Sequence, residues 1–174
     1  VITAPFTYAA TANVIVHCGA KPVFVDVDPV TMNINPDLIE RKITRRTKAI
    51  IPVHFAGRPC EMNRILEIAR KHKLIVIQDA AHALEAHYRG KKIGEIGDFT
   101  AFSFYATKNL TTGDGGMVTT QNPRWAKALK ILASQGMTLG ACKRYSKSGY
   151  KHYQILMPGY KCNLMDLQAG MGLR

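Results

Sequence analysis

Residues 61–78 read EMNRILEIARKHKLIVIQ, a helical pattern that runs directly into a strand pattern. Apolar side chains recur at helical spacing on one stripe of residues 61–72, namely Met62, Ile65, Leu66 and Ala69. Residues 75–78 are apolar and rich in β-branched side chains, which is typical of a buried strand. An amphipathic helix that leads into a buried strand packs against the sheet that this strand joins. The stretch therefore predicts an α/β fold.

The same alternation of strand and helix patterns extends along the whole chain. Strands are expected at 1–4, 22–25, 49–53, 75–78, 99–104 and 117–120. Helices are expected at 8–17, 37–41, 61–72, 125–134 and 164–173. Because strands separated by helices form βαβ units, the sheet should be mainly parallel and flanked by helices. No repeat, low-complexity tract or Gly/Ser-rich linker divides residues 1–174, so one domain is expected.

The composition is that of a globular domain with a basic balance. The chain has 174 residues, of which 47% are hydrophobic, and a formal net charge of +12. The basic residues are dispersed, and only 143–151, KRYSKSGYK, combines several of them with aromatic residues. A solvated loop is the favoured interpretation of this segment, and a nucleic-acid contact is the alternative. The positive charge could also steer a substrate that carries two phosphates, such as a nucleotide-linked sugar.

Signals for membranes and secretion are missing from the sequence. No apolar run approaches the roughly 20 residues that cross a bilayer, and the first residues do not resemble a signal peptide. The four cysteines form no CxxC pair, so neither a zinc site nor a disulfide framework is suggested. A soluble, cytoplasmic protein is expected. Since the first residue is Val1 and a helical pattern is still running at Arg174, we also expect a fragment.

Residues 99–118, FTAFSFYATKNLTTGDGGMV, surround one lysine with hydroxyl groups and glycines. Lys108 lies in the loop between two expected strands, where Ser103 and Thr107 can hydrogen-bond a phosphate. A partly desolvated lysine amine is available for Schiff-base formation with an aldehyde, which makes Lys108 a candidate nucleophile. The alternative is a solvated loop lysine without a function, the usual state of a lone lysine.

Residues 75–83, IVIQDAAHA, end the expected buried strand with a carboxylate and a histidine. Ligands bind at the carboxyl ends of parallel strands, which is where Asp79 is placed. A carboxylate there can keep a pyridinium nitrogen protonated, so that pyridoxal phosphate (PLP) can withdraw electrons from a substrate carbon. Asp79 could instead cap the following turn by accepting a backbone N–H. His82 could reach the ring hydroxyl of the same cofactor, or it could be a buried histidine without a function.

The segments DAAHA and SFYATKNLTTGDGG closely resemble those of the DegT/StrS-type sugar aminotransferases, which are fold-type-I PLP enzymes. Further similar blocks follow in the usual order of that family: TAPFTYAATANVI, GAKPVFVDVDP, TKAIIPVHFAG, GDGGMVTT and PGYKCNLMDLQAG. The resemblance implies that residues 1–174 are the PLP-binding large domain, similar to that of aspartate aminotransferase. It also implies that an N-terminal segment and a smaller C-terminal domain are absent from the sequence.

The resemblance implies an activity and two central residues. Lys108 would form the internal aldimine and then shuttle a proton between the cofactor carbon and the sugar carbon. Asp79 would pair with the pyridine nitrogen. The amino group would come from glutamate and go to the keto group of a nucleotide-linked sugar.

Further site residues follow from the same resemblance. Tyr8 would stack on the cofactor ring, His82 would approach the ring oxygen, and Ser103 would bind the phosphate. Asn163 would reach the phosphate held by a neighbouring subunit, so that the functional unit would be a homodimer with shared active sites.

Three other functions remain as alternatives. A PLP-dependent sugar dehydratase has histidine in place of the Schiff-base lysine, so Lys108 argues against it. A regulatory or sensor protein of the same fold would bind PLP without completing transamination. A nucleic-acid-binding module rests only on the net charge and on residues 143–151, and we expect neither a nucleic-acid nor a membrane partner.

Overall fold

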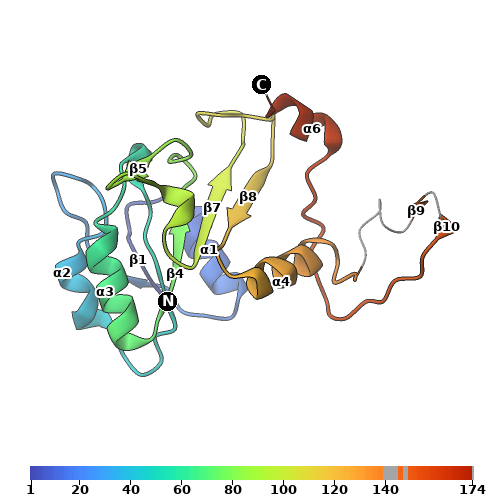
Figure 1. The fold of residues 1–174 in the computed structure, drawn as a ribbon. Helices are drawn as coiled ribbons and strands as arrows, with labels where there is room; N and C mark the ends of the chain where they lie inside the picture. Colours follow the sequence, from blue (N-terminus) through green and yellow to red (C-terminus); the bar gives the residue numbers. More distant parts are fainter. Residues whose placement is uncertain (139–144, 147–148, 174) are drawn as a thin grey trace.

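A six-stranded sheet forms the centre of the computed structural model, which describes residues 1–138, 145–146 and 149–173. Its strands follow the order β2-β1-β3-β4-β7-β8 (Figure 1). Their bounds are β1 (Ile2–Thr3), β2 (Val23–Phe24), β3 (Ala49–Ile51), β4 (Ile75–Asp79), β7 (Phe99–Ser103) and β8 (Gly116–Thr119). All the paired neighbours from β2 to β7 are parallel, and β8 is antiparallel to β7. The expected α/β class and mainly parallel sheet are confirmed.

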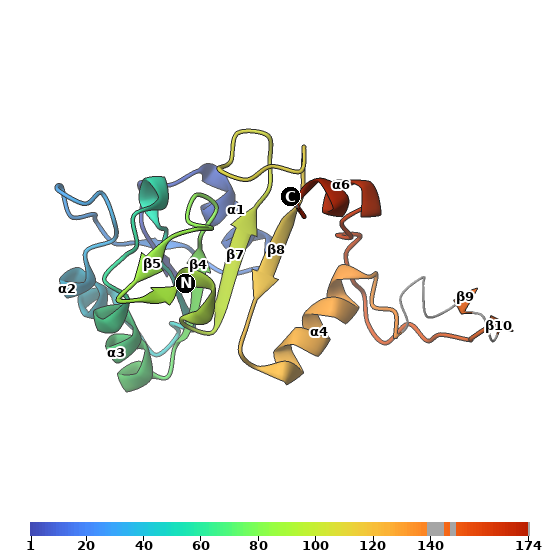
Figure 2. The ribbon, with the colours of Figure 1, turned by 45° about the horizontal axis from the view of Figure 1, so that its top comes forward.

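Helices cover both faces of this sheet. They are α1 (Ala9–His17), α2 (Pro36–Ile39), α3 (Met62–His72), α4 (Pro123–Ala133) and α6 (Asp166–Met171). Ile50 and Val76 belong to the buried core beside α3, whereas their neighbours Ile51 and Ile77 line a cavity beside α1. Because successive strand side chains point to opposite faces, α3 and α1 lie on opposite faces of the sheet. In Figure 2, α4 and α6 lie beyond β8, at the end of the sheet away from α3.

The apolar stripe of α3 explains why this helix packs on the sheet. Met62 and Ile65 are fully buried, and the helix ends at His72, which is followed by Lys73 with a left-handed φ of 53°. Proline and asparagine start two other helices: the side chain of Asn35 caps α2, and that of Asn122 caps α4. Each asparagine oxygen satisfies backbone N–H groups that have no partner within the first helical turn. Among the described residues, no helix is both long and apolar enough to cross a membrane.

Short elements are the main difference from the expected pattern. A hairpin of β5 (His87–Tyr88) and β6 (Lys91–Lys92) was not expected, because YRGKK lacks the apolar alternation of a strand. Its turn residues Arg89 and Gly90 both have positive φ, which is the geometry of a tight two-residue turn. The basic segment 143–151 falls partly outside the described residues. Its described part contains β9 (Tyr145–Ser146) and β10 (Gly149–Tyr150), which pair antiparallel.

Gly57 brings two loops into close contact at the end of the sheet. It has a φ of 82°, and a β-carbon added there would lie 2.7 Å from the backbone oxygen of His82. We therefore expect Gly57→Ala to lower the free energy of unfolding by about 1–3 kcal/mol, since both the left-handed backbone and the carbonyl contact oppose a side chain. The shift of the urea unfolding midpoint of the full-length protein measures this effect.

Gly90→Ala is the matched control for Gly57→Ala. Gly90 has a similar φ of 80°, but an added β-carbon would meet no atom within 4 Å. The Gly90 variant should therefore show only the backbone cost, and its midpoint should shift less. Equal shifts for the two variants would mean that the contact with the His82 carbonyl does not matter for stability.

Candidate active site

A cavity of about 710 Å³ opens where β4 and β7 end, beside the first turn of α1. Its walls include most of the residues that the sequence nominates: Tyr8, Asp79, His82, Ser103 and Lys108. They come from the start of α1, the end of β4 and the turn after it, and the end of β7 and the loop after it. The parallel sheet therefore brings chemical groups from distant parts of the sequence to one place, at the edge where ligands bind in such sheets.

Asp79 is the last residue of β4, and both of its carboxylate oxygens are hydrogen-bonded. Oδ2 accepts a hydrogen bond of 2.7 Å from the hydroxyl of Thr11, and Oδ1 accepts one of 3.1 Å from the backbone N–H of Ala81. The second bond belongs to the turn after β4, so Asp79 does stabilise that turn, as the capping alternative supposed. Because a carboxylate oxygen has two lone pairs, Asp79 can still accept a further hydrogen bond from a ligand in the cavity.

Lys108 lies in the loop after β7 and points toward His82. Its Nζ is 2.8 Å from Nε2 of His82, so the amine donates to the imidazole when that nitrogen carries no proton. The backbone N–H of Lys108 also donates to the carbonyl of Tyr105 at 2.9 Å, which closes a turn around the lysine. Lys108 is partly buried as a residue, and its contact with His82 lies at an exposed position.

Tyr8 and Ser103 lie on other parts of the same wall. Tyr8 is the residue before α1 and is 84% exposed, so its ring is available to a flat ligand that enters the cavity. Ser103 ends β7, and its hydroxyl accepts a hydrogen bond of 3.3 Å from the backbone N–H of Tyr105. The hydroxyl proton of Ser103 remains available for an acceptor such as a phosphate oxygen.

Thr11 lines the cavity although the sequence did not nominate it. It lies in the first turn of α1, three residues after Tyr8, and it is only 4% exposed. Helical spacing puts residues three apart on the same side of a helix, so its proximity to Tyr8 could have been inferred. Its bond to Asp79 could not, because that contact joins segments 68 residues apart.

A second cavity of about 400 Å³ adjoins the first and shares Tyr8, Asp79 and His82 with it. His54 also borders this space, but the histidine is only 2% exposed. Its Nδ1 accepts from the backbone N–H of Cys60 at 3.1 Å, and its Nε2 lies 3.0 Å from Oε1 of Gln78. Burial lowers the pKa of the His54 imidazole, so the ring is neutral. Both ring nitrogens already have partners in the core, which accords with leaving His54 out of the site.

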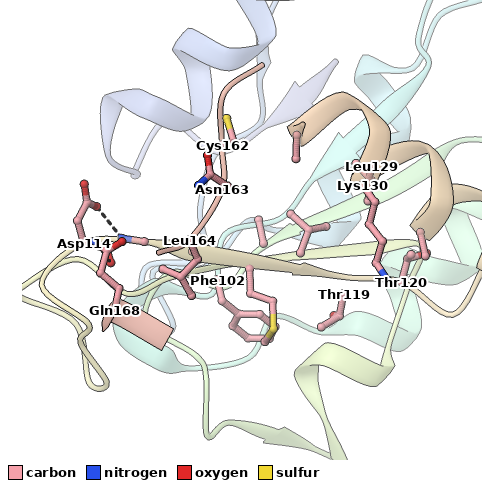
Figure 3. Close-up of a pocket in the computed structure, with 17 residues that line it drawn as sticks. Phe102, Asp114, Thr119, Thr120, Leu129, Lys130, Cys162, Asn163, Leu164 and Gln168 are labelled. Carbon is pink, nitrogen blue, oxygen red and sulfur yellow. Dashed lines mark hydrogen bonds between the residues drawn. The ribbon is translucent and has the colours of Figure 1, made fainter. Parts of the chain in front are cut away.

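Asn163 does not join the other nominated residues. It lines a different cavity, of about 760 Å³, between β8, α4 and the segment before α6 (Figure 3). Its side-chain oxygen accepts a hydrogen bond from Nζ of Lys161, and the residue is exposed. Within one chain, therefore, Asn163 is separate from Lys108.

Residues 1–174 match one protein family along their whole length. The model of the DegT/DnrJ/EryC1/StrS aminotransferase family matches residues 1–174. The spore coat polysaccharide biosynthesis protein SpsC of Bacillus subtilis is 52% identical over 173 residues, and the GDP-perosamine synthase of Caulobacter vibrioides is 44% identical over 173 residues. Each of these matches covers 99% of this chain and 44% of the relative.

Solved structures of the family have the same fold. The putative sugar aminotransferase Spr1654 from Streptococcus pneumoniae, in its PMP-form, has a TM-score of 0.89 and 37% sequence identity. The match covers 99% of this chain and 48% of that one. The chain thus spans less than half the length of the relatives that it matches, and it belongs to the DegT/DnrJ/EryC1/StrS aminotransferase family.

Proposed function

We propose that residues 1–174 are the PLP-binding large domain of an aminotransferase that transfers an amino group from glutamate to a keto group on a nucleotide-linked sugar. The observation that carries this proposal is the single cavity that contains Lys108, Asp79 and Ser103. Two relatives support the substrate class, because one is named a GDP-perosamine synthase and another a sugar aminotransferase. We also propose a cytoplasmic location, since such substrates are charged, water-soluble metabolites.

The donor set of the cavity fits PLP. The amine of Lys108 suits an aldehyde, the carboxylate of Asp79 suits a ring nitrogen, and the hydroxyl of Ser103 suits a phosphate oxygen. Spr1654 has been solved in both a PLP-form and a PMP-form, which supports the same cofactor here. When bound, PLP supplies an aldehyde that condenses with amines and a pyridinium ring that withdraws electrons from the substrate carbon.

Lys108 is the proposed catalytic base. A lysine amine can remove a proton at Nζ from the substrate carbon and return it elsewhere, provided that the amine is neutral and well oriented. The imidazole of His82 accepts a hydrogen bond from this amine when Nε2 carries no proton, and this contact orients Nζ at the wall of the cavity. The two residues lie 26 positions apart in sequence, and only the junction of β4 and β7 brings them together.

The other residues bind and orient. Asp79 would hold the proton on a ring nitrogen, Ser103 would donate to the phosphate, and Tyr8 would cover the face of the ring. In the proposed homodimer, Asn163 of one subunit reaches the phosphate in the other subunit's site. This part of the proposal is supported by two observations: Asn163 is exposed, and it does not line the cavity that contains Lys108 of its own chain.

The same fold could serve a PLP-binding sensor or a sugar dehydratase. The dehydratase alternative is disfavoured because residue 108 is lysine and not histidine. The sensor alternative differs in chemistry alone, since a sensor would hold PLP without exchanging its amino group. Reaction with glutamate therefore separates an enzyme from a sensor.

An absorbance spectrum of the full-length protein with PLP tests the proposal. We expect the visible band of lysine-bound PLP, and we expect glutamate to replace it with the shorter-wavelength band of pyridoxamine phosphate. A band that persists unchanged with glutamate would favour the sensor. If no band forms with PLP, neither PLP-dependent function holds.

A further inference from the structure

A chain of hydroxyl groups lies behind the carboxylate of Asp79. The Oγ1 atoms of Thr7 and Thr11 are 2.8 Å apart, and Oγ1 of Thr11 is 2.7 Å from Oδ2 of Asp79. Thr11 is 4% exposed, so water does not compete for its hydroxyl. Neither threonine is among the residues nominated from the sequence.

The direction of these hydrogen bonds is fixed by counting protons. An ionised carboxylate can only accept, so the single hydroxyl proton of Thr11 goes to Asp79. The hydroxyl of Thr7 must then donate to the oxygen of Thr11. Each donor polarises the next, and the positive end of the chain is directed at Oδ2 of Asp79.

The opposite oxygen of Asp79 is held independently. The backbone N–H of Ala81 donates to Oδ1, so the carboxylate is fixed at both oxygens and cannot rotate freely. Thr11 lies in the first turn of α1. Tyr8 directly precedes this turn and lines the same cavity. One helical turn thus controls both the wall of the cavity and the orientation of its carboxylate.

We propose that Thr11, supported by Thr7, is a positioning residue that orients the Asp79 carboxylate toward the ring nitrogen of PLP. The inference rests on the proposed function. Without the hydroxyl, Asp79 loses a charge-assisted hydrogen bond from a buried donor, and its orientation is then set by Ala81 alone. The result is a carboxylate that meets the ring nitrogen in a less favourable geometry.

Thr11→Val is the test variant, because valine keeps the shape of threonine and has a methyl group in place of the hydroxyl. In the full-length protein we expect the dissociation constant of PLP to rise about 10-fold. This change corresponds to the free energy of one hydrogen bond to a charged group. Thr11→Ser, which keeps the hydroxyl, should restore the affinity for PLP, and Thr7→Val should have a smaller effect of about 2-fold to 3-fold.

A double-mutant cycle separates positioning from simple packing. If Thr11 acts through Asp79, Thr11→Val should add almost nothing to the loss of PLP affinity caused by Asp79→Ala. An undiminished effect of Thr11→Val in the Asp79→Ala protein, or failure of Thr11→Ser to restore affinity, would overturn the inference. So would unchanged PLP affinity in Thr11→Val alone. If the wild-type protein does not bind PLP, the proposed function fails, and this inference fails with it.

Discussion

Full-length protein in which Lys108 is replaced by alanine should lose transamination by at least about 10³-fold. The variant loses both the amine that reacts with the cofactor aldehyde and the base that moves the substrate proton. Non-covalent binding of PLP should largely survive, because Asp79 and Ser103 line the same cavity and are unchanged. Amino transfer from glutamate, followed by the absorbance of the cofactor, measures the loss, and equilibrium dialysis measures the retained binding.

Lys92→Ala is the matched control for the Lys108 variant. Lys92 is an exposed residue of β6, in a hairpin outside the cavity, so this variant should keep its rate within about twofold. A Lys108 variant that retained full activity would rule out the assigned Schiff-base residue. Loss of PLP binding together with loss of activity would instead show that the contacts of Asp79 and Ser103 do not retain the cofactor without the lysine.

The sequence predicted the helices and strands whose local hydrophobic pattern matches the side chains that the fold buries. The stripe of Met62 and Ile65 predicted α3, because the same residues that show helical spacing are the ones buried against the sheet. The order of the strands in the sheet could not be predicted, because β4 pairs with β7 and a hairpin lies between these two strands in the sequence. That hairpin depends on the turn at Gly90 and not on an apolar face, so hydrophobic periodicity could not show it.

The candidate site was readable to a different degree for each residue. The sequence placed Asp79 at a strand end and Lys108 in a glycine-rich loop, and the structure brings both to one cavity. The contact of Lys108 with His82 needed the fold, because strand pairing sets which loops meet. Thr11 was hidden for another reason: a buried threonine in a helix has the same local pattern as a small core residue, and only its 2.7 Å bond to Asp79 distinguishes it.

Asp79→Asn should lower the rate of amino transfer by about 10²-fold to 10³-fold, the usual cost of removing one preorganised electrostatic contact. The amide has nearly the same shape, and its single oxygen can still accept from one of the two donors, the hydroxyl of Thr11 or the backbone N–H of Ala81, which contact different oxygens of the carboxylate. It carries no charge, however, so it cannot keep a ring nitrogen protonated, and the ring withdraws electrons less strongly. We expect the loss to fall on the rate of the reaction with glutamate more than on the affinity for PLP.

The double variant Lys108→Ala/Asp79→Asn shows whether the two residues serve one reaction. Residues that act as a unit have non-additive effects. The rate of the double variant should therefore be at most about 10-fold lower than the rate of Lys108→Ala alone. Stopped-flow absorbance of the reaction with glutamate provides the rates for all four proteins. Asp79→Asn with a wild-type rate would remove Asp79 from the proposed site. Fully multiplicative losses would mean that Asp79 and Lys108 contribute to separate steps, one to binding the cofactor and the other to moving the proton.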